Sequence, residues 1–176
     1  MLSSNLLSAQ TLSPQAEIRV MTMGPFQQEL YSAFGHSAFR VTDPVNNYDL
    51  VYNYGVFDFQ QKNFYYNFLR GKMLYKLGLA RYNRFQPRYA RENRYVYEQV
   101  LNLSQEEKQI VFDFLKNNSK PENRDYMYNY VMDNCATKIR DVIRLSLGDK
   151  ITFDTSYVEP GLTFRDLMDR YCEYQY

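Results

Sequence analysis

The stretch Phe34-Gly35-His36-Ser37-Ala38-Phe39-Arg40 places the only histidine of the chain at the start of an apolar segment with the pattern of a strand. A second stretch, Asp133-Asn134-Cys135-Ala136-Thr137, places a cysteine at the start of an amphipathic helix. Imidazole and thiol are the two side chains whose pairing produces a thiolate near neutral pH. His36 and Cys135 are therefore the candidate base and nucleophile of a thiol-dependent hydrolase or acyltransferase.

The pattern of the remaining chain predicts an α+β domain with an antiparallel sheet. Alternating apolar residues predict strands over 15–23, 36–41, 50–54, 73–80 and 94–103. Helical spacing predicts helices over 58–70, over 105–116 behind a Ser104-Gln105-Glu106-Glu107 capping box, over 135–147, and after Thr163. The segment around Pro87 is expected to be a connection, and 126–132 to be extended or irregular. We expect the sheet to pack against the Cys135 helix and two or three others.

The length of 176 residues and the mass of 21.1 kDa fit one domain with a sizeable core. We expect that single domain to span residues 15–176. Residues 1–14 are expected to be a signal remnant or a disordered lead, because Leu6-Leu7-Ser8-Ala9-Gln10 is typical of the end of a secretory signal. No apolar run reaches the ~18 residues that a membrane-spanning helix needs.

The composition narrows the classes of partner. A net charge of +1 supplies no global field for nucleic acid or an anionic membrane. The chain has 18 tyrosines and 12 phenylalanines, which either form strands and core rim or wall an amphipathic groove. One basic segment interleaves arginines with aromatic residues and could stack on bases, but nearby Glu92 and Glu98 favour a solvated face, so we expect no nucleic-acid partner. Its arginines are Arg81, Arg84, Arg88, Arg91 and Arg94.

The two cysteines, Cys135 and Cys172, are too few for a disulfide framework. Neither has a metal-ligand spacing to the single histidine, so we expect no metal and no organic cofactor.

A third residue would orient the imidazole. If the strands around His36 and Leu50 form a hairpin centred between Pro44 and Val45, Asn53 lies opposite His36. Asp49 then lies on the same face, two pleats along. A carboxamide or carboxylate beside an imidazole fixes its tautomer, so Asn53 is the first candidate for this role and Asp49 the second.

The position of Cys135 favours its thiolate form. Asp133 or Asn134 can cap the helix, and the thiol in the first turn then lies in the field of the helix dipole, which lowers its pKa. On carbonyl attack, the Cys135 amide and the Asn134 side chain are the expected oxyanion donors.

The order of a histidine strand ahead of an Asn-Cys helix resembles that of the circularly permuted papain-like thiol enzymes, the group that includes lecithin retinol acyltransferase. Four segments resemble the Lnb N-terminal periplasmic domain family, a bacterial family of largely unknown function. These segments are Phe34-Gly35-His36-Ser37, Asp49-Leu50-Val51-Tyr52-Asn53-Tyr54-Gly55-Val56-Phe57-Asp58-Phe59, Glu98-Gln99-Val100-Leu101-Asn102-Leu103-Ser104 and Asp133-Asn134-Cys135-Ala136-Thr137-Lys138-Ile139-Arg140-Asp141.

The resemblance implies an exported domain of the cell envelope with a permuted papain-like fold and with His36 and Cys135 at the catalytic positions. Thr22-Met23-Gly24-Pro25-Phe26 departs from the family pattern, because a second family cysteine is missing there. Family members often continue beyond Thr163 into membrane-spanning parts, so the resemblance implies that this chain is either a fragment or a short soluble form. If it is a fragment, the flanking regions would bring the domain near a membrane.

Two functions from different classes remain open on the sequence. A thiol enzyme would act on a small molecule, a peptide such as a cell-wall stem peptide, or an acyl lipid, through a thioester. Alternatively, the domain binds or assists assembly of an envelope protein without catalysis, in which case Cys135 has ordinary reactivity.

Overall fold

The chain folds around one antiparallel sheet in the computed structural model, which describes residues 10–29, 32–57, 66–67, 70, 73–156 and 158–172. In this part of the chain the strand order is β5-β1-β2-β3-β4-β6. The strands are β1 Glu17–Met23, β2 His36–Asp43, β3 Tyr48–Phe57, β4 Met73–Arg81, β5 Val96–Val100 and β6 Asp125–Tyr128. The predicted α+β class is confirmed, whereas the helix expected over 58–70 lies largely outside the described residues.

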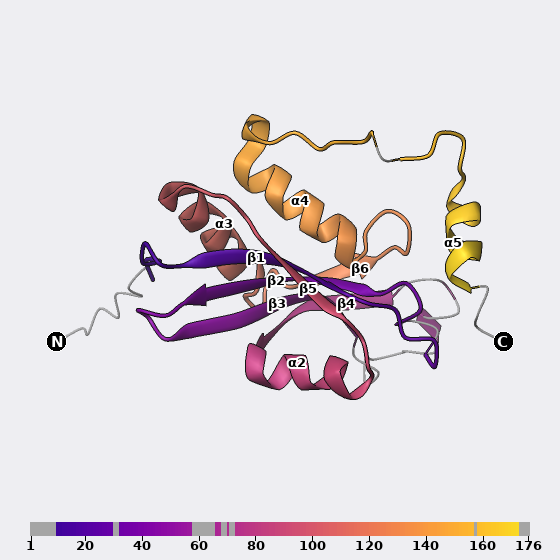
Figure 1. Cartoon of the computed structure of the whole chain (residues 1–176), viewed down its shortest axis with the longest axis horizontal. Coiled ribbons are helices and arrows are strands. Elements are labelled where there is room, and N and C mark those ends of the chain that lie inside the picture. The colour runs from indigo at the N-terminus through magenta and orange to yellow at the C-terminus, as the bar shows by residue number, and fades with distance from the viewer. Residues whose placement is uncertain are drawn as a thin grey trace.

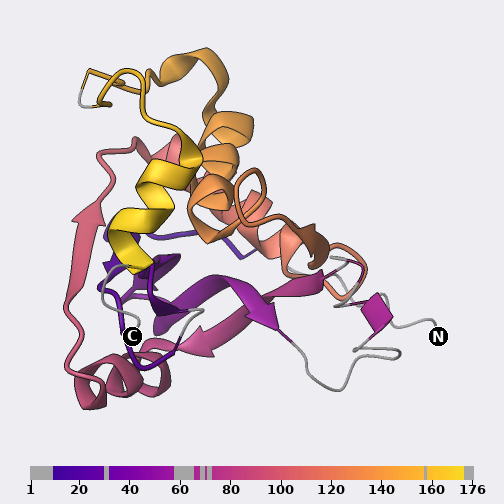
Figure 2. The ribbon, with the colours of Figure 1, turned by 90° about the vertical axis from the view of Figure 1, so that its right-hand side faces the viewer.

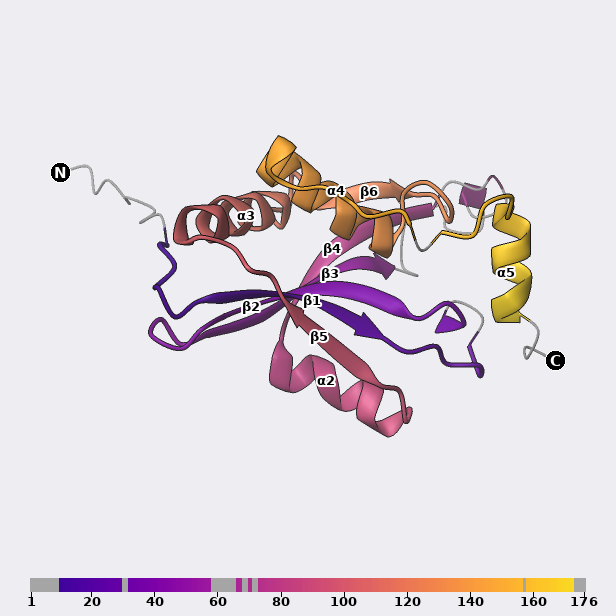
Figure 3. The same ribbon diagram turned by 45° about the horizontal axis from the view of Figure 1, so that its top comes forward.

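Helices cover both faces of the sheet (Figure 1). They are α2 Tyr82–Arg91, α3 Gln105–Asn118, α4 Cys135–Leu147 with a short 3-10 turn η2 Gly148–Lys150, and α5 Phe164–Cys172. The view in Figure 3 shows α3 and α4 on one side of the strands and α2 on the other. Helix α5 stands apart from α4 at the right-hand end of the molecule in Figure 1, the end that faces the viewer in Figure 2.

Strand alternation divides the buried residues between the two faces. On the α3 and α4 side, the larger core joins residues of the sheet to both helices. Its members include Ile18, Phe39, Val41, Tyr52, Tyr54 and Leu77 from the strands, and Val111, Phe112, Leu115, Ile139 and Val142 from the helices. On the other side, a smaller core packs against Tyr89 of α2 and contains Met21, Met23, Ala38 and Val51. The sheet is therefore buried on both faces.

Helix α2 corrects the expectation of a connection around Pro87. The helix contains Pro87 in its interior, where proline removes one backbone hydrogen bond. Its apolar side nevertheless buries Tyr89 and packs Tyr82 and Phe85 against the smaller core. Tertiary burial of this amphipathic face outweighs the local cost of the proline.

The packed domain begins before residue 15. Leu12 is buried, and its backbone N–H donates to the Gln109 side chain at 2.8 Å. The Gln105 side chain donates to the Leu12 carbonyl at 2.6 Å. The residues from Gln10 to Pro14 are thus held on α3, and the rest of the 1–14 segment lies outside the described residues.

The hairpin between β2 and β3 differs from the predicted register by two residues. Phe39 pairs with Tyr52, and Thr42 pairs with Asp49, so the turn is centred one residue later than expected. The cause is Asp43, whose buried carboxylate accepts hydrogen bonds from the backbone of Val45 and Asn46 and so organises the turn. A shift of two residues preserves the facing of every side chain.

Asp43 also ties the N-terminal segment to this turn. Its carboxylate accepts from the Ser13 backbone at 2.7 Å and from the Ser13 hydroxyl at 2.6 Å. Burial raises the pKa of Asp43, but these bonds and those from Asn46 outweigh burial and lower the pKa to about 2. The carboxylate therefore stabilises the fold above the unfolded-state pKa of ~3.9, and this stabilisation is lost as the pH falls through about 2.

We predict that Asp43→Asn lowers the free energy of unfolding at pH 7 by about 2 kcal/mol, because the substitution removes the charge that these donors stabilise. Urea unfolding at pH 7 and at low pH measures the effect. The difference from the wild type should shrink as the pH falls below 4, and the exposed Glu122→Gln serves as the control. Equal stability of Asp43→Asn and Glu122→Gln at pH 7 would contradict the assignment.

Candidate active site

The site lies where β2 and β3 stop pairing with each other. Their ladder ends at Phe39 and Tyr52. Beyond this point β2 continues beside β1 as far as the pair of His36 with Met23, while β3 continues beside β4. Because each strand keeps a different partner, the two separate toward the His36 end of the sheet.

A bulge in β3 follows directly. One extra residue lies between the pairs of Asn53 with Gly78 and of Val56 with Lys76. The bulge contains Gly55 at a φ of 90°, a conformation that favours glycine. A Cβ atom at Gly55 would lie 3.7 Å from His36 Cε1 and 3.9 Å from Cys135 Cβ. The bare backbone of Gly55 therefore passes next to both side chains.

His36 and Asn53 are hydrogen-bonded across the separation. His36 Nε2 and Asn53 Oδ1 are 2.5 Å apart. A carboxamide oxygen can only accept, so Nε2 carries a proton and donates. This arrangement leaves Nδ1 as the ring nitrogen that can exchange a proton with a second group.

Cys135 is the first residue of α4, and its neighbour Asn134 caps that helix. Asn134 Oδ1 accepts from the backbone N–H of Ala136 at 2.9 Å and of Thr137 at 3.0 Å. The Thr137 hydroxyl in turn accepts from the Asn134 backbone at 2.8 Å, which completes a capping box. The cap fixes where the helix begins and hence where the thiol lies.

The environment of Cys135 favours its thiolate. Burial raises the pKa of the thiol, but a hydrogen bond and the charge of His36, with backbone donors at Ser37 and Ala136, outweigh burial and lower the pKa below its ordinary value. The side chain is half-buried and packs against the larger core. A lowered thiol pKa and a neighbouring imidazole are what a nucleophile near neutral pH requires.

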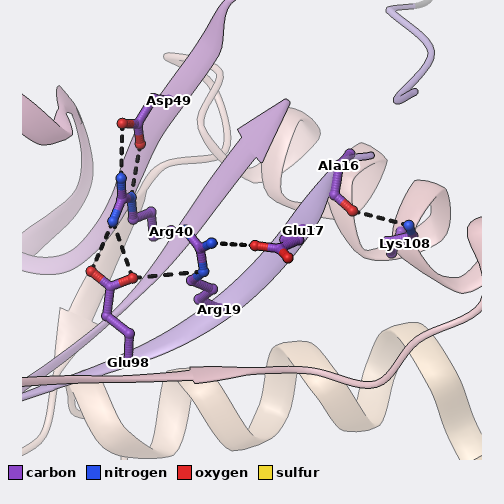
Figure 4. Close-up of polar contacts among 7 residues, drawn as sticks. All are labelled: Ala16, Glu17, Arg19, Arg40, Asp49, Glu98 and Lys108. Carbon is purple, nitrogen blue, oxygen red and sulfur yellow. Dashed lines mark hydrogen bonds and ion pairs between the residues drawn. The ribbon is translucent and has the colours of Figure 1, made fainter. Parts of the chain in front are cut away.

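Asp49 lies away from this group. Its carboxylate binds Arg40 through two hydrogen bonds, at 2.8 Å from Nε and 2.9 Å from Nη2. Figure 4 shows Arg40 held between Asp49 and Glu98, with Arg19 extending the network to Glu17. Asp49 is four residues from Asn53 along β3, a distance of about 13 Å. The structure therefore places Asn53 against His36 and places Asp49 in a separate ion-pair network.

Asn134 serves the helix and the loop before it. Besides its capping oxygen, its Nδ2 donates to the Tyr130 carbonyl at 2.8 Å. Two backbone bonds between Asn129 and Asp133 close that loop. These bonds hold the Asn134 carboxamide toward the loop, so the structure gives it a capping role in place of the expected position at an oxyanion.

Sequence reasoning missed the row of tyrosines that precedes Cys135. Tyr126 and Tyr128 alternate along β6, and the ring of Tyr126 lies 6.2 Å from that of Tyr54 and beneath Lys138, whose Nζ is 4.4 Å from it. Tyr130 packs on Phe34, with ring centroids 5.1 Å apart. The signal in the sequence was the spacing of tyrosines at every second residue up to the start of the cysteine helix. This spacing predicts that their side chains share one face and line one side of the site beside the thiol.

Other possible binding features lie elsewhere. An open pocket of about 460 Å³ at the turn end of β2 and β3 is lined by residues that include Arg19, Arg40 and Asp49, and it contains neither His36 nor Cys135. Across the described ranges, histidine, cysteine and acidic side chains form no group of three or more that could hold a metal ion. In the basic segment, Arg88 and Arg94 pair with Glu92.

Comparison with known proteins identifies one family. The model of the Lnb N-terminal periplasmic domain matches residues 6–170. No curated protein and no solved structure matches the chain. Among the helices of the described ranges, none is long and apolar enough to cross a membrane.

We predict that Asn53→Ala slows alkylation of Cys135 by iodoacetamide about tenfold near pH 6, because His36 loses the partner that orients it. The rate is measured against pH in a Cys172→Ser background, which leaves Cys135 as the single thiol. Asp49→Asn is the matched control and should leave the profile unchanged. An equal effect of both substitutions, or none from Asn53→Ala, would refute the orienting role.

Proposed function

Because the chain belongs to the Lnb N-terminal periplasmic domain family, we propose that it is a cysteine-dependent hydrolase or acyltransferase of the bacterial envelope. It acts on an amide or an ester through a thioester intermediate. The observation that carries this proposal is the group formed by Cys135, His36 and Asn53, in which a thiol of lowered pKa meets an imidazole held by a carboxamide. The family description, that of a periplasmic domain, supports the location.

The chemistry follows from this arrangement. His36 accepts the thiol proton at Nδ1, and Cys135 Sγ attacks the substrate carbonyl carbon. The tetrahedral intermediate collapses when His36 protonates the leaving group, which leaves a thioester on Cys135. Water or another acceptor then attacks the thioester while His36 takes its proton, and the C–S bond breaks to release the product and the Cys135 thiolate. Asn53 holds the imidazole in one tautomer during both steps.

The permuted papain-like assignment is part of the proposal. A thiol at a helix N-terminus, a histidine on a strand of the packed sheet, and an asparagine behind the ring are the roles of a Cys-His-Asn group. Here the histidine strand β2 precedes the cysteine helix α4 in the chain. This order supports the permuted form.

The surroundings of the thiol support a substrate with apolar surface. Tyr128, Tyr130 and Phe34 lie around the site, and Met132, two residues before Asn134, is 69% exposed. A peptide, a cell-wall stem peptide or an acyl lipid each offers a carbonyl beside apolar atoms. These are the substrates to test first.

We predict that p-nitrophenyl acetate releases a burst of nitrophenol and leaves an acetyl group on Cys135, because the paired thiolate attacks the ester faster than water attacks the thioester. Absorbance follows the burst, and peptide mass spectrometry locates the adduct. Cys135→Ala should abolish both, and His36→Ala should slow the burst at least about a hundredfold, the lower end of the contribution of a general base.

Cys172→Ser is the control, and it should retain both the burst and the adduct. Acetylation of Cys172 at the rate of Cys135, or an unchanged burst in Cys135→Ala, would contradict the proposal. The alternative of a non-catalytic binding domain would then be favoured. Adding an amine as a second acceptor then separates hydrolysis from transfer.

A further inference from the structure

The first turn of α4 leaves one backbone donor free beside the thiol. The N–H groups of Asn134, Ala136 and Thr137 are taken by the cap, and that of Lys138 donates to the Asn134 carbonyl. Within the described residues the N–H of Cys135 has no acceptor. A tetrahedral oxyanion is normally held by more than one donor, and Asn134 is directed to the loop. The site therefore needs a second donor from another element.

Tyr128 is fixed in place near the start of α4. The antiparallel bridge between Asn129 and Asp133 brings Tyr128, one residue before it, alongside Asn134, the neighbour of Cys135. Tyr128 is the last residue of β6 and pairs with Met73 of β4. Its ring stacks on that of Tyr75, with centroids 4.2 Å apart and an interplanar angle of 25°. A stacked ring on a paired strand presents its hydroxyl in a fixed direction, which is the preorganisation that an oxyanion donor requires.

The hydroxyl of Tyr128 is available, whereas that of Tyr126 is not. Among the described residues, Tyr128 makes no side-chain hydrogen bond, and its hydroxyl oxygen is not fully buried. The oxygen of Tyr126 is fully buried without a hydrogen-bond partner, so a substrate cannot reach it. Of the two phenols on β6, only Tyr128 can therefore meet a bound carbonyl.

The electrostatics link Tyr128 to the nucleophile. Burial raises the pKa of Tyr128, and among charged neighbours the Cys135 thiolate raises it most. Tyr128 raises the pKa of Tyr126 more than Cys135 does. Likewise, Cys172 raises the pKa of Tyr130 more than Cys135 does. Tyr128 thus keeps its proton at neutral pH, and its hydroxyl can donate a hydrogen bond.

We propose that the Tyr128 hydroxyl and the Cys135 N–H together form the oxyanion hole, an inference that rests on the proposed function. As Sγ bonds to the carbonyl carbon, the π electron pair moves to oxygen, which accepts from both donors. Collapse restores the carbonyl bond and breaks the bond to the leaving group, which takes its proton from His36. Tyr128 donates a hydrogen bond throughout and transfers no proton.

Two probes separate this role from activation of the thiol. Acylation by p-nitrophenyl acetate passes through an oxyanion, whereas alkylation by iodoacetamide is a displacement at saturated carbon and forms none. In the full chain with Cys172→Ser, Tyr128→Phe should slow acylation of Cys135 at least about tenfold, a small value for loss of one donor. Its rate of alkylation and the pH dependence of that rate should stay unchanged.

Two matched controls remove a phenol hydroxyl without touching the proposed hole. Tyr126→Phe loses the buried hydroxyl on the same strand, and Tyr97→Phe loses one from a residue that is 67% exposed on β5. Both should acylate at the rate of the parent. Equal slowing of acylation and alkylation in Tyr128→Phe, no slowing, or the same slowing in Tyr126→Phe would overturn the role of Tyr128. Failure of the parent to acylate at Cys135 would instead overturn the proposed function.

Discussion

The hydrogen bond from His36 Nε2 to Asn53 Oδ1 spans the place where β2 and β3 part, and the geometry of the site depends on it. Without the separation, the end of the sheet would be closed by ladder hydrogen bonds. Without the hydrogen bond, the imidazole could turn either nitrogen toward the thiol. The bulge at Gly55 brings bare backbone next to both side chains, at the place where α4 brings Cys135 to the ring.

Features set by neighbouring residues could be predicted from the sequence. The capping box of Ser104 and Glu107 forms at the start of α3, and Gly148 follows the last residue of α4. The first-turn position of Cys135 depends only on the capping chemistry of Asn134, so it too was predictable. The position of Asn53 on the same face as His36 could be predicted because side chains alternate between the two faces along a strand. An error of two residues in the register does not change which face a side chain occupies.

Features set by distant residues could not be predicted in this way. The true register depends on Asp43, whose carboxylate also binds Ser13 from another part of the chain. Asp49 pairs with Arg40, and the same arginine also pairs with Glu98 from β5. The relation of Tyr128 to Cys135 requires the pairing of β6 with β4, which local patterns do not specify. In each case a long-range contact decides between locally equivalent alternatives.

The most direct measurement is a pH titration of the Cys135 thiolate by its ultraviolet absorbance, in a Cys172→Ser background with and without His36→Ala. The account predicts a thiolate that forms below the ordinary thiol pKa of ~8.5 and a midpoint that rises when His36 is removed. A midpoint near the ordinary value in both proteins would contradict the pairing of imidazole and thiol on which the proposed activity depends.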